Sequence, residues 1–241
     1  MKVVKQAFDI LTPISTDGMA ELEHIEKVAR VCYKSEPQCQ RILGESDIHY
    51  EHRKMQVTKK FVEGLIRHGH EAMLEHSRIA VLITTDRGVS HELVRHRLAS
   101  YAQESTRYCN YSKDKFGSEI TVIEPPFKEK EGHLHNIWWH QCSMAEQAYM
   151  DLLENGWTPQ MARSVLPTCT KTDIIITANY REWRNIFKLR CAPDAHPQMR
   201  EIMLQILSSF HSKIPVIFDD IYSEYIAKNT SSFIGEQNSL S

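Results

Sequence analysis

The feature that most constrains the fold is a long helical pattern of apolar residues over Glu131–Glu154. Its apolar side chains recur every three or four residues, the spacing at which they line one face of an α-helix. They are Leu134, Trp138, Ala145, Ala148, Tyr149 and Leu152. The segment therefore predicts a long helix with one buried face, and Gly156 caps its C-terminal end.

Shorter patterns of helix and strand fill most of the remaining chain. Helical spacing predicts helices at Met19–Tyr33, Lys54–His68, Val89–Arg97, Arg181–Leu189 and Met199–Ser212, and one that begins at Thr158-Pro159 and stops before Pro167. β-rich runs predict strands at Val3–Ile10, Ile79–Thr85, Ile120–Ile123 and Lys171–Ala178. No linker divides these elements, so we expect a single α/β (α+β) domain over residues 1–228, followed by a loose polar tail at residues 229–241. Its central sheet is expected to be mostly antiparallel and flanked by helices.

Charge and hydropathy exclude several classes of protein. The chain has 29 Lys and Arg against 31 Asp and Glu, a formal net charge of −2, which argues against a protein that binds a nucleic-acid polymer. The longest apolar stretches, Ile79–Ile83 and Ile174–Ile176, fall far short of the ~20 residues that a membrane-spanning helix needs. The first residues show no secretory leader. We therefore expect a cytoplasmic protein that does not bind a membrane.

The six cysteines are irregularly spaced and form no C-x-x-C pair. Disulfide frameworks are usual in short secreted chains and rare in the cytosol. We interpret these cysteines as reduced and mostly structural thiols.

The segment Ser90–Tyr111 is the densest in groups that could bind an anion. Arginine forks match two oxygens of a phosphate, and neighbouring hydroxyls complete such a cradle. From the residues alone, an ordinary solvated basic face is an equally open interpretation. A nucleotide- or RNA-binding module without catalysis is a further alternative, because three tyrosines interleave the arginines.

Two other clusters allow more than one interpretation. His68, His70, Glu75 and His76 could belong to a metal hydrolase, or the histidines could simply lie near the last carbonyls of a helix. If Arg181–Leu189 is helical, Asn185 lies one turn after Arg181 on the same face. That face could bind a ligand or be an ordinary charged outer surface.

Four segments, in the family's order, resemble the flavin-dependent thymidylate synthases. Arg95-His96-Arg97, followed after seven residues by Ser105, is similar to the R-H-R-x7-S signature. Arg67–His76 resembles the segment R-H-G-H-E-x-x-x-E-H, Ala162–Pro167 resembles A-R-x-x-L-P, and Asn179–Arg190 resembles N-x-R-x-x-x-N-x-x-x-L-R. The resemblance spans roughly residues 60–212.

The resemblance implies a methyltransferase that converts dUMP to dTMP. It implies FAD as cofactor, 5,10-methylenetetrahydrofolate as the one-carbon donor and NADPH as reductant. It also implies a homotetramer whose active sites are shared between subunits, and chemistry without an enzyme nucleophile. The absence of a Pro-Cys-His site agrees with that last point. Because all these ligands are anionic, a pocket rich in arginine is compatible with the net charge of −2.

The resemblance also implies roles for individual residues. Those expected to bind FAD are His70, Ala72, Arg95, His96, Arg97, Gln103, Asn179, Tyr180, Arg181, Asn185 and His196. Those expected to bind dUMP are Glu92, Leu93, Val94, Arg95, Gln103, Glu104, Ser105, Thr106, Arg107, Arg163 and Arg190. Ser105 and Arg107 are assigned to the phosphate. Arg190 is the expected catalytic residue, placed beside the uracil ring to favour its N3/O4 anionic form. Ser105 is not expected to be a nucleophile, because no G-x-S-x-G pattern or evident base accompanies it.

The chain departs from the family pattern at several of these positions. Ala102 and Gln103 replace the usual Asn and Glu, and Glu92 stands where Gln is common. Gln103 can still donate and accept hydrogen bonds but carries no charge. Ala72 replaces a Ser or Thr and can offer no hydroxyl group to FAD. Two extra residues separate Arg190 from His196.

Overall fold

The structure is a computed structural model that describes residues 1–36, 39–114, 117–126 and 132–228, so the expected tail at 229–241 lies outside the described residues. The chain divides into two compact units. Unit 1 contains Met1–Ile10 and Val81–Ile176, and unit 2 contains Leu11–Ala80 and the chain from Thr177 onward. The unit boundaries fall inside strands β3 (Arg78–Asp86) and β6 (Lys171–Asn179). The α/β class is confirmed, whereas the domain limits 1–228 stay a prediction.

The larger sheet has four strands in the order β2-β3-β6-β4. Strand β2 (Ala7–Ile10) runs antiparallel to β3. Strand β6 also runs antiparallel to β3, because Thr84 Oγ1 donates to Asp173 Oδ1 at 2.7 Å while the Arg87 backbone N–H donates to the Thr168 carbonyl at 3.0 Å. Burial alternates along β3 and β6, as expected for strands with one covered face.

The expected strand Val3–Ile10 is in fact two strands in two sheets. Strand β1 (Lys2–Val4) pairs in parallel with β5 (Thr121–Ile123) in a separate two-stranded sheet, whereas β2 joins β3. The prediction of one continuous strand over Val3–Ile10 is therefore wrong. The reason is that the two halves of this segment find different pairing partners, which the sequence of one strand does not encode.

The Arg-rich segment folds differently from the sequence expectation. Helix α3 (Arg87–Leu93) is capped by Asp86, whose Oδ1 accepts the Val89 N–H at 2.7 Å, and it ends four residues earlier than expected. Strand β4 (Ala99–Gln103), which was not expected, follows a short turn. The Tyr101 hydroxyl donates to the carbonyls of Leu93 at 2.6 Å and His96 at 2.9 Å, so it holds that turn.

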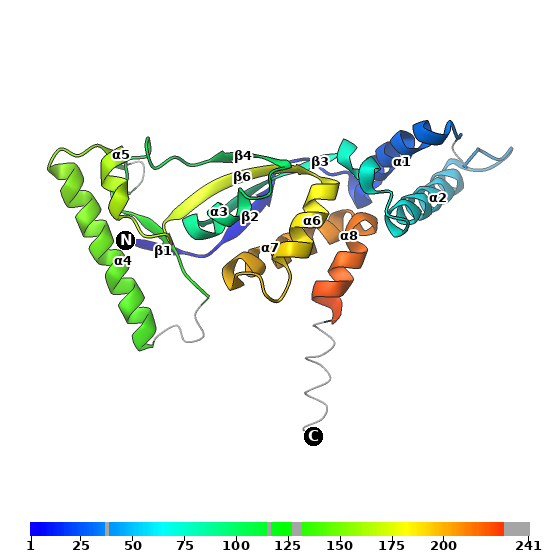
Figure 1. Ribbon diagram of the computed structural model, residues 1–241. Coiled ribbons are helices and arrows are strands. Elements are labelled where there is room, and N and C mark those ends of the chain that lie inside the picture. The colour runs from blue at the N-terminus through cyan, green and yellow to red at the C-terminus, as the bar shows by residue number, and fades with distance from the viewer. Residues whose placement is uncertain (37–38, 115–116, 127–131, 229–241) are drawn as a thin grey trace, which may run out of the picture. The chain divides into compact units, whose positions relative to one another are not determined.

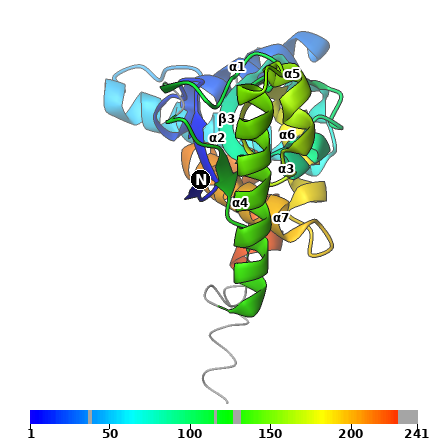
Figure 2. The same cartoon turned by 90° about the vertical axis from the view of Figure 1, so that its left-hand side faces the viewer.

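Unit 1 is completed by the long helix and two short ones. Helix α4 (His133–Glu154) confirms the long apolar stripe, and α5 (Pro159–Ala162) with the 3₁₀ turn η4 (Arg163–Val165) follows it. Figures 1 and 2 both show α5 beside α4. The core cluster of unit 1 consists of Tyr111, Ile120, Val122, Cys142, Tyr149 and Ala162.

Unit 2 is largely helical. Helix α1 (Met19–Tyr33) has the expected bounds, and α2 (Asp47–Arg67) begins seven residues earlier than expected because Ser46 Oγ accepts the His49 N–H and caps it. The remaining elements are η1 (Thr16–Gly18), η2 (Glu71–His76), α6 (Tyr180–Arg190), α7 (Pro197–Lys213), α8 (Pro215–Tyr222) and η5 (Ser223–Ala227). Rings from α6, α7 and α8 form one aromatic cluster. The ring centroids of Trp183 and Phe210 are 5.0 Å apart, and those of Phe187 and Phe218 are 5.7 Å apart.

All six cysteines are free thiols, as expected. Among the described residues, no helix has both the length and the apolar character needed to cross a bilayer.

Candidate functional site

The residues expected to bind ligands fall into two groups, one in each unit. Unit 1 holds the residues of α3, the turn after it, β4, the segment Gln103–Arg107 and η4. Unit 2 holds those of η2, α6 and the start of α7.

The segment Gln103–Arg107 and the helix that carries Arg163 are in direct contact. Arg163 Nη1 donates to Thr106 Oγ1 at 3.2 Å, and Arg107 Nε donates to Gln160 Oε1 at 3.0 Å. Both arginines are exposed, and within the described part of the chain neither guanidinium pairs with a carboxylate. Two uncompensated guanidinium groups beside the hydroxyls of Ser105 and Thr106 form an arrangement that suits a phosphate.

The Arg95–Arg97 turn presents two arginines and buries the histidine between them. Arg95 and Arg97 are exposed, whereas His96 is buried. Ahead of the turn, Val94 is exposed and Glu92 is half-buried, while the Leu93 side chain lies in the core. Leu93 can therefore contact a ligand only through its backbone, and the roles of all these residues stay predictions.

Gln103 and Glu104 make hydrogen bonds within the protein. Gln103 Nε2 donates to Ser90 Oγ at 2.9 Å and to Thr172 Oγ1 at 3.2 Å. The Glu104 carboxylate accepts from the Tyr111 hydroxyl at 3.0 Å and from Lys171 Nζ at 3.1 Å. Sequence reasoning did not find Tyr111 and Lys171, because no motif marks them.

Charge and burial shift the pKa values of these two partners. Burial and the neighbouring Glu104 raise the pKa of Tyr111. Burial alone would lower the pKa of Lys171, but its hydrogen bond to Asp173 and the charge of Glu104 raise it instead. Both groups therefore stay protonated at neutral pH and can donate to Glu104.

In unit 2, the turn η2 is tied to α6 by two ion pairs. Arg181 Nη1 pairs with Glu75, and Arg184 Nη2 lies 3.1 Å from Glu71. His70 caps η2 and is exposed, as is Ala72. The expected FAD ligands from these two segments therefore lie on connected elements of one unit.

Helix α6 has one buried face and one exposed face. Arg181 and Asn185 lie one turn apart on the exposed face, as the sequence predicts. Asn179 Oδ1 accepts the Glu182 N–H at 2.8 Å and caps the helix, so its amide N–H groups are the part left for a ligand. The Tyr180 side chain is buried edge-on against Phe218, and its backbone N–H donates to the Ser77 carbonyl at 3.1 Å, so its role as a cofactor ligand stays a prediction.

Arg190 and His196 lie on either side of the connection between α6 and α7. Arg190 is the half-buried last residue of α6, and His196 is an exposed residue at the N-cap of α7. Arg200 Nε donates to the Cys191 carbonyl at 3.0 Å and so fixes the connection.

The histidine cluster after α2 does not form a metal site. His68 Nδ1 lies 2.7 Å from the Gly64 carbonyl oxygen, which is the helix-terminal contact of the alternative interpretation. Over the described ranges, no group of three or more His, Cys, Asp or Glu side chains is arranged to hold a metal ion. The metal-hydrolase hypothesis therefore has no ligand set among these residues.

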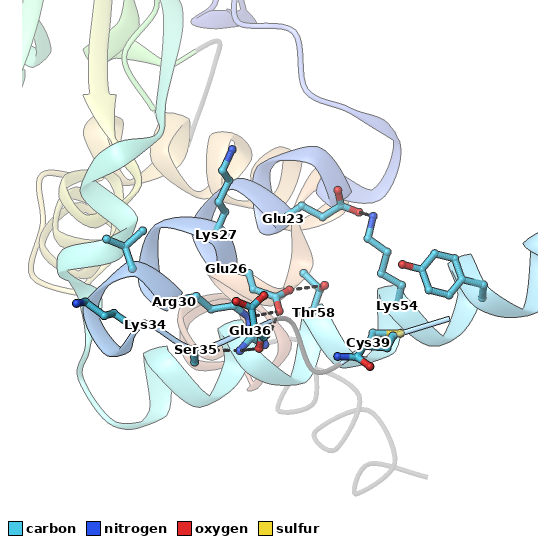
Figure 3. Close-up of a pocket in the computed structure, with 13 residues that line it drawn as sticks. Glu23, Glu26, Lys27, Arg30, Lys34, Ser35, Glu36, Cys39, Lys54 and Thr58 are labelled. Carbon is cyan, nitrogen blue, oxygen red and sulfur yellow. Dashed lines mark hydrogen bonds and ion pairs between the residues drawn. The ribbon is translucent and has the colours of Figure 1, made fainter. Parts of the chain in front are cut away.

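A cavity of about 700 Å³ between α1 and α2 contains none of the expected site residues (Figure 3). Several charges along it are paired within the protein: Arg30 Nε lies 2.8 Å from Glu26 Oε1, and Lys54 Nζ lies 2.8 Å from Glu23. Thr58 donates to the second oxygen of Glu26. The contacts of Thr58 and Lys54 join α2 to α1, and the cavity gives no sign of a phosphate site.

The fold, together with the neighbouring Arg107 and Arg163, defines an α/β protein whose guanidinium-rich surface suits an anionic ligand. A family described as thymidylate synthase complementing protein matches residues 16–216. The chain therefore belongs to the family of flavin-dependent thymidylate synthases.

Individual relatives support this assignment. The chain is 32% identical over 193 residues to the flavin-dependent thymidylate synthase of Geobacter sulfurreducens, covering 80% of this chain and 78% of that one. It is 28% identical over 233 residues to that of Corynebacterium aurimucosum, covering 89% and 86%. A crystal structure of the UMP/dUMP methylase PolB from Streptomyces cacaoi, bound with 5-Br UMP, shares the fold with a TM-score of 0.68 and 19% identity, covering 93% of this chain and 97% of that one.

Proposed function

We propose that this protein is a flavin-dependent thymidylate synthase that methylates dUMP to dTMP. It would take the one-carbon unit from 5,10-methylenetetrahydrofolate and use NADPH to reduce FAD. The observation that carries the proposal is the pair Arg107 and Arg163 in a member of this family. Neither has a carboxylate partner among the described residues, Arg163 bonds the Thr106 hydroxyl, and the Arg107 backbone N–H bonds the Ser105 hydroxyl. No metal takes part in the proposed reaction.

The phosphate of dUMP is assigned to this arginine pair. A nucleotide monophosphate carries up to two negative charges, and guanidinium forks bind such groups with two parallel hydrogen bonds. Arg95, on the neighbouring turn, is assigned to the same nucleotide. The exposure of all three side chains supports this assignment.

FAD fits the exposed groups of unit 2. The cofactor contains two phosphates and a ring system rich in hydrogen-bonding atoms, and it matches the imidazole of His70, the guanidinium of Arg181 and the amide of Asn185. Arg97 and His196 are assigned to it from motif position. When bound, FAD supplies the hydride for the methylation, and the protein supplies placement and charge.

Arg190 is assigned to activation of the uracil ring. A fixed cation beside N3 and O4 stabilises the negative charge that develops there, an effect worth roughly 3–4 kcal/mol in a dry site. The half-buried position at the end of α6 supports this role, because partial burial reduces screening by water.

Ser105 is assigned to phosphate binding, with no covalent role. Its Oγ accepts the Arg107 N–H at 3.3 Å, and no His or carboxylate bonds to it in the described part of the chain. A serine nucleophile needs such a base for activation.

A cytoplasmic homotetramer with shared active sites is part of the proposal. Large apolar side chains are exposed along α4, and they include Leu134, Ile137, Trp139 and Met144. Exposed apolar clusters of this kind commonly mark contacts between subunits. Light scattering of the purified protein would give the mass of a tetramer if the proposal holds, and the mass of a monomer would contradict it.

The decisive test is the reaction itself. Purified protein should be yellow and should form dTMP from dUMP, methylenetetrahydrofolate and NADPH. Absence of product with FAD fully supplied would overturn the proposal. Steeply salt-dependent binding of single-stranded RNA, without bound flavin, would favour a binding module instead.

A further inference from the structure

Glu104 lies inside the segment assigned to the nucleotide phosphate, yet its side chain is bonded at both oxygens within the protein. Oε1 accepts from the Tyr111 hydroxyl at 3.0 Å, and Oε2 accepts from Lys171 Nζ at 3.1 Å. Only 15% of the Glu104 side chain is exposed. A carboxylate with two charged or polar donors in place has little capacity left for an anionic ligand, which it would also repel.

The backbone of Glu104 is bonded on both sides as well. Its N–H donates to the Asp173 carbonyl at 2.9 Å, and its own carbonyl accepts from Arg87 Nη2 at 2.9 Å. These contacts attach the residue before Ser105 to β6 and to the first residue of α3. The peptide that leads into the phosphate-binding residues is therefore held from two directions.

Lys171 connects this anchor to the sheet. Its ammonium group pairs with both Glu104 and Asp173, and Asp173 accepts from Thr84 Oγ1 on β3 at 2.7 Å. A single lysine on β6 thus joins the segment after β4 to a network that reaches β3. Three strands of the sheet contribute to the position of one loop.

We propose that Glu104 is a positioning residue for the nucleotide-binding segment, and that Lys171 and Tyr111 are the groups that hold it. This inference rests on the proposed function and replaces the direct dUMP contact that the motif position of Glu104 implies. Ser105, Thr106 and Arg107 contact the phosphate, while Glu104 sets the direction in which they point.

The size of the effect follows from the surroundings of the network. A cavity of about 560 Å³ is lined by Glu104, Tyr111, Lys171 and Asp173, so water reaches these charges and screens them. Loss of the lysine is therefore expected to loosen the loop and leave the fold intact. We expect a rise of about tenfold in KM for dUMP, which corresponds to the lower end of the range for a single charge-assisted hydrogen bond.

The test compares Lys171→Met with Lys54→Met, a matched lysine whose ion pair with Glu23 lies in unit 2 at 2.8 Å. Lys171→Met should raise KM for dUMP about tenfold, change kcat less than threefold and leave the flavin absorbance unchanged. Lys171→Arg should restore most of the loss, and Lys54→Met should leave KM unaltered. The dissociation constant of dUMP, measured by calorimetry on the holoenzyme, should follow KM.

Tyr111→Phe and Glu104→Gln keep the proposal testable if Lys171→Met does not fold. Each should raise KM by a smaller factor than Lys171→Met, with kcat retained. An unchanged KM in all three variants would overturn the positioning role, as would a 100-fold loss of kcat at unaltered KM in Glu104→Gln. If the wild-type protein neither binds dUMP nor forms dTMP, the proposed function itself fails, and this inference fails with it.

Discussion

An arginine pair in unit 1 and a single arginine in unit 2 have opposite surroundings. In unit 1, Arg107 and Arg163 are exposed and bond to neutral side chains. In unit 2, Arg184 is fully buried, and both of its terminal nitrogens bond to Asp220, at 2.8 and 2.7 Å. Glu71 and the Ile217 carbonyl complete its surroundings.

The contrast separates an arginine that is compensated within the protein from one that is left available to a ligand. A buried guanidinium must be compensated by carboxylates, because an unpaired charge in the interior is costly. An exposed guanidinium without a carboxylate keeps its hydrogen-bonding capacity for a ligand. Substitution of either kind of arginine should therefore change a different property of the protein.

Arg190→Ala is expected to reduce kcat by about 10²–10³-fold, because it removes the charge assigned to the uracil ring. FAD retention, measured from the visible absorbance after gel filtration, should change far less. Equal losses of turnover and flavin would contradict the activating role and place Arg190 among the cofactor ligands.

Arg184→Met is expected to lower the free energy of unfolding by about 3 kcal/mol, which is the lower end of the range for a broken buried ion pair. The lower end applies because the Asp220 side chain is 51% exposed and can be hydrated once its partner is gone. Urea unfolding followed by circular dichroism measures the change. Unaltered stability would show that burial of this arginine contributes nothing to the fold.

Arg163→Met is expected to produce the reverse pattern. The dissociation constant of dUMP should rise about tenfold or more, whereas the free energy of unfolding should stay within about 0.5 kcal/mol of the wild type. Calorimetric titration and urea unfolding of the same preparation test both parts. A destabilised protein with normal dUMP affinity would remove the distinction between the two arginines.

Ser105→Ala is expected to weaken dUMP binding by about fivefold, since it removes one neutral hydroxyl from the phosphate site. Turnover at saturating dUMP should remain measurable. Complete loss of turnover under those conditions would support a nucleophilic serine instead.

The smallest effect concerns acid stability. Burial alone would raise the pKa of Asp220, but hydrogen bonds and charge from Arg184 lower it. A carboxylate whose pKa is lowered in the folded state stabilises the protein fully when the pH is above the pKa of the unfolded state, about 3.9. This contribution disappears as the pH falls through the pKa of the folded state. The stability gap between wild type and Arg184→Met should therefore narrow from pH 5 to pH 3 in urea unfolding. A gap that stays constant would contradict the assignment.

The parts of the fold that were predictable have strong local patterns. Met19–Tyr33 and the stripe of α4 repeat apolar residues at helical spacing, and the run of β3 is rich in β-branched residues. The start of α2 lacks an apolar stripe, because its first residues are exposed and the Ser46 cap sets where the helix begins. Strand β4 is short and has no fully buried residue, so its pairing beside β6 in the sheet, which no local pattern encodes, makes it a strand.

In the candidate site, the residues that belong to a motif were predictable from the sequence, and the residues that hold them in place were not. Motif spacing predicts the arginines of unit 1 as ligands, and the structure brings one of them, Arg163, into contact with Thr106. The contact between Lys171 and Glu104 was not predictable, since the two residues are 67 positions apart and no local pattern links them. Nor does the sequence distinguish Arg184 from its neighbour Arg181, although one is buried and the other exposed.

The two faces of α6 have a practical consequence. The residues assigned to FAD project from the outer side of a helix whose inner side is wedged into the ring cluster of Trp183, Phe187, Phe210 and Phe218. Substitutions that loosen the packing of that cluster would change the orientation of the helix before the protein unfolds. The flavin absorbance of a preparation would then fall before the helical signal in circular dichroism does. It would therefore report on the packing of this ring cluster.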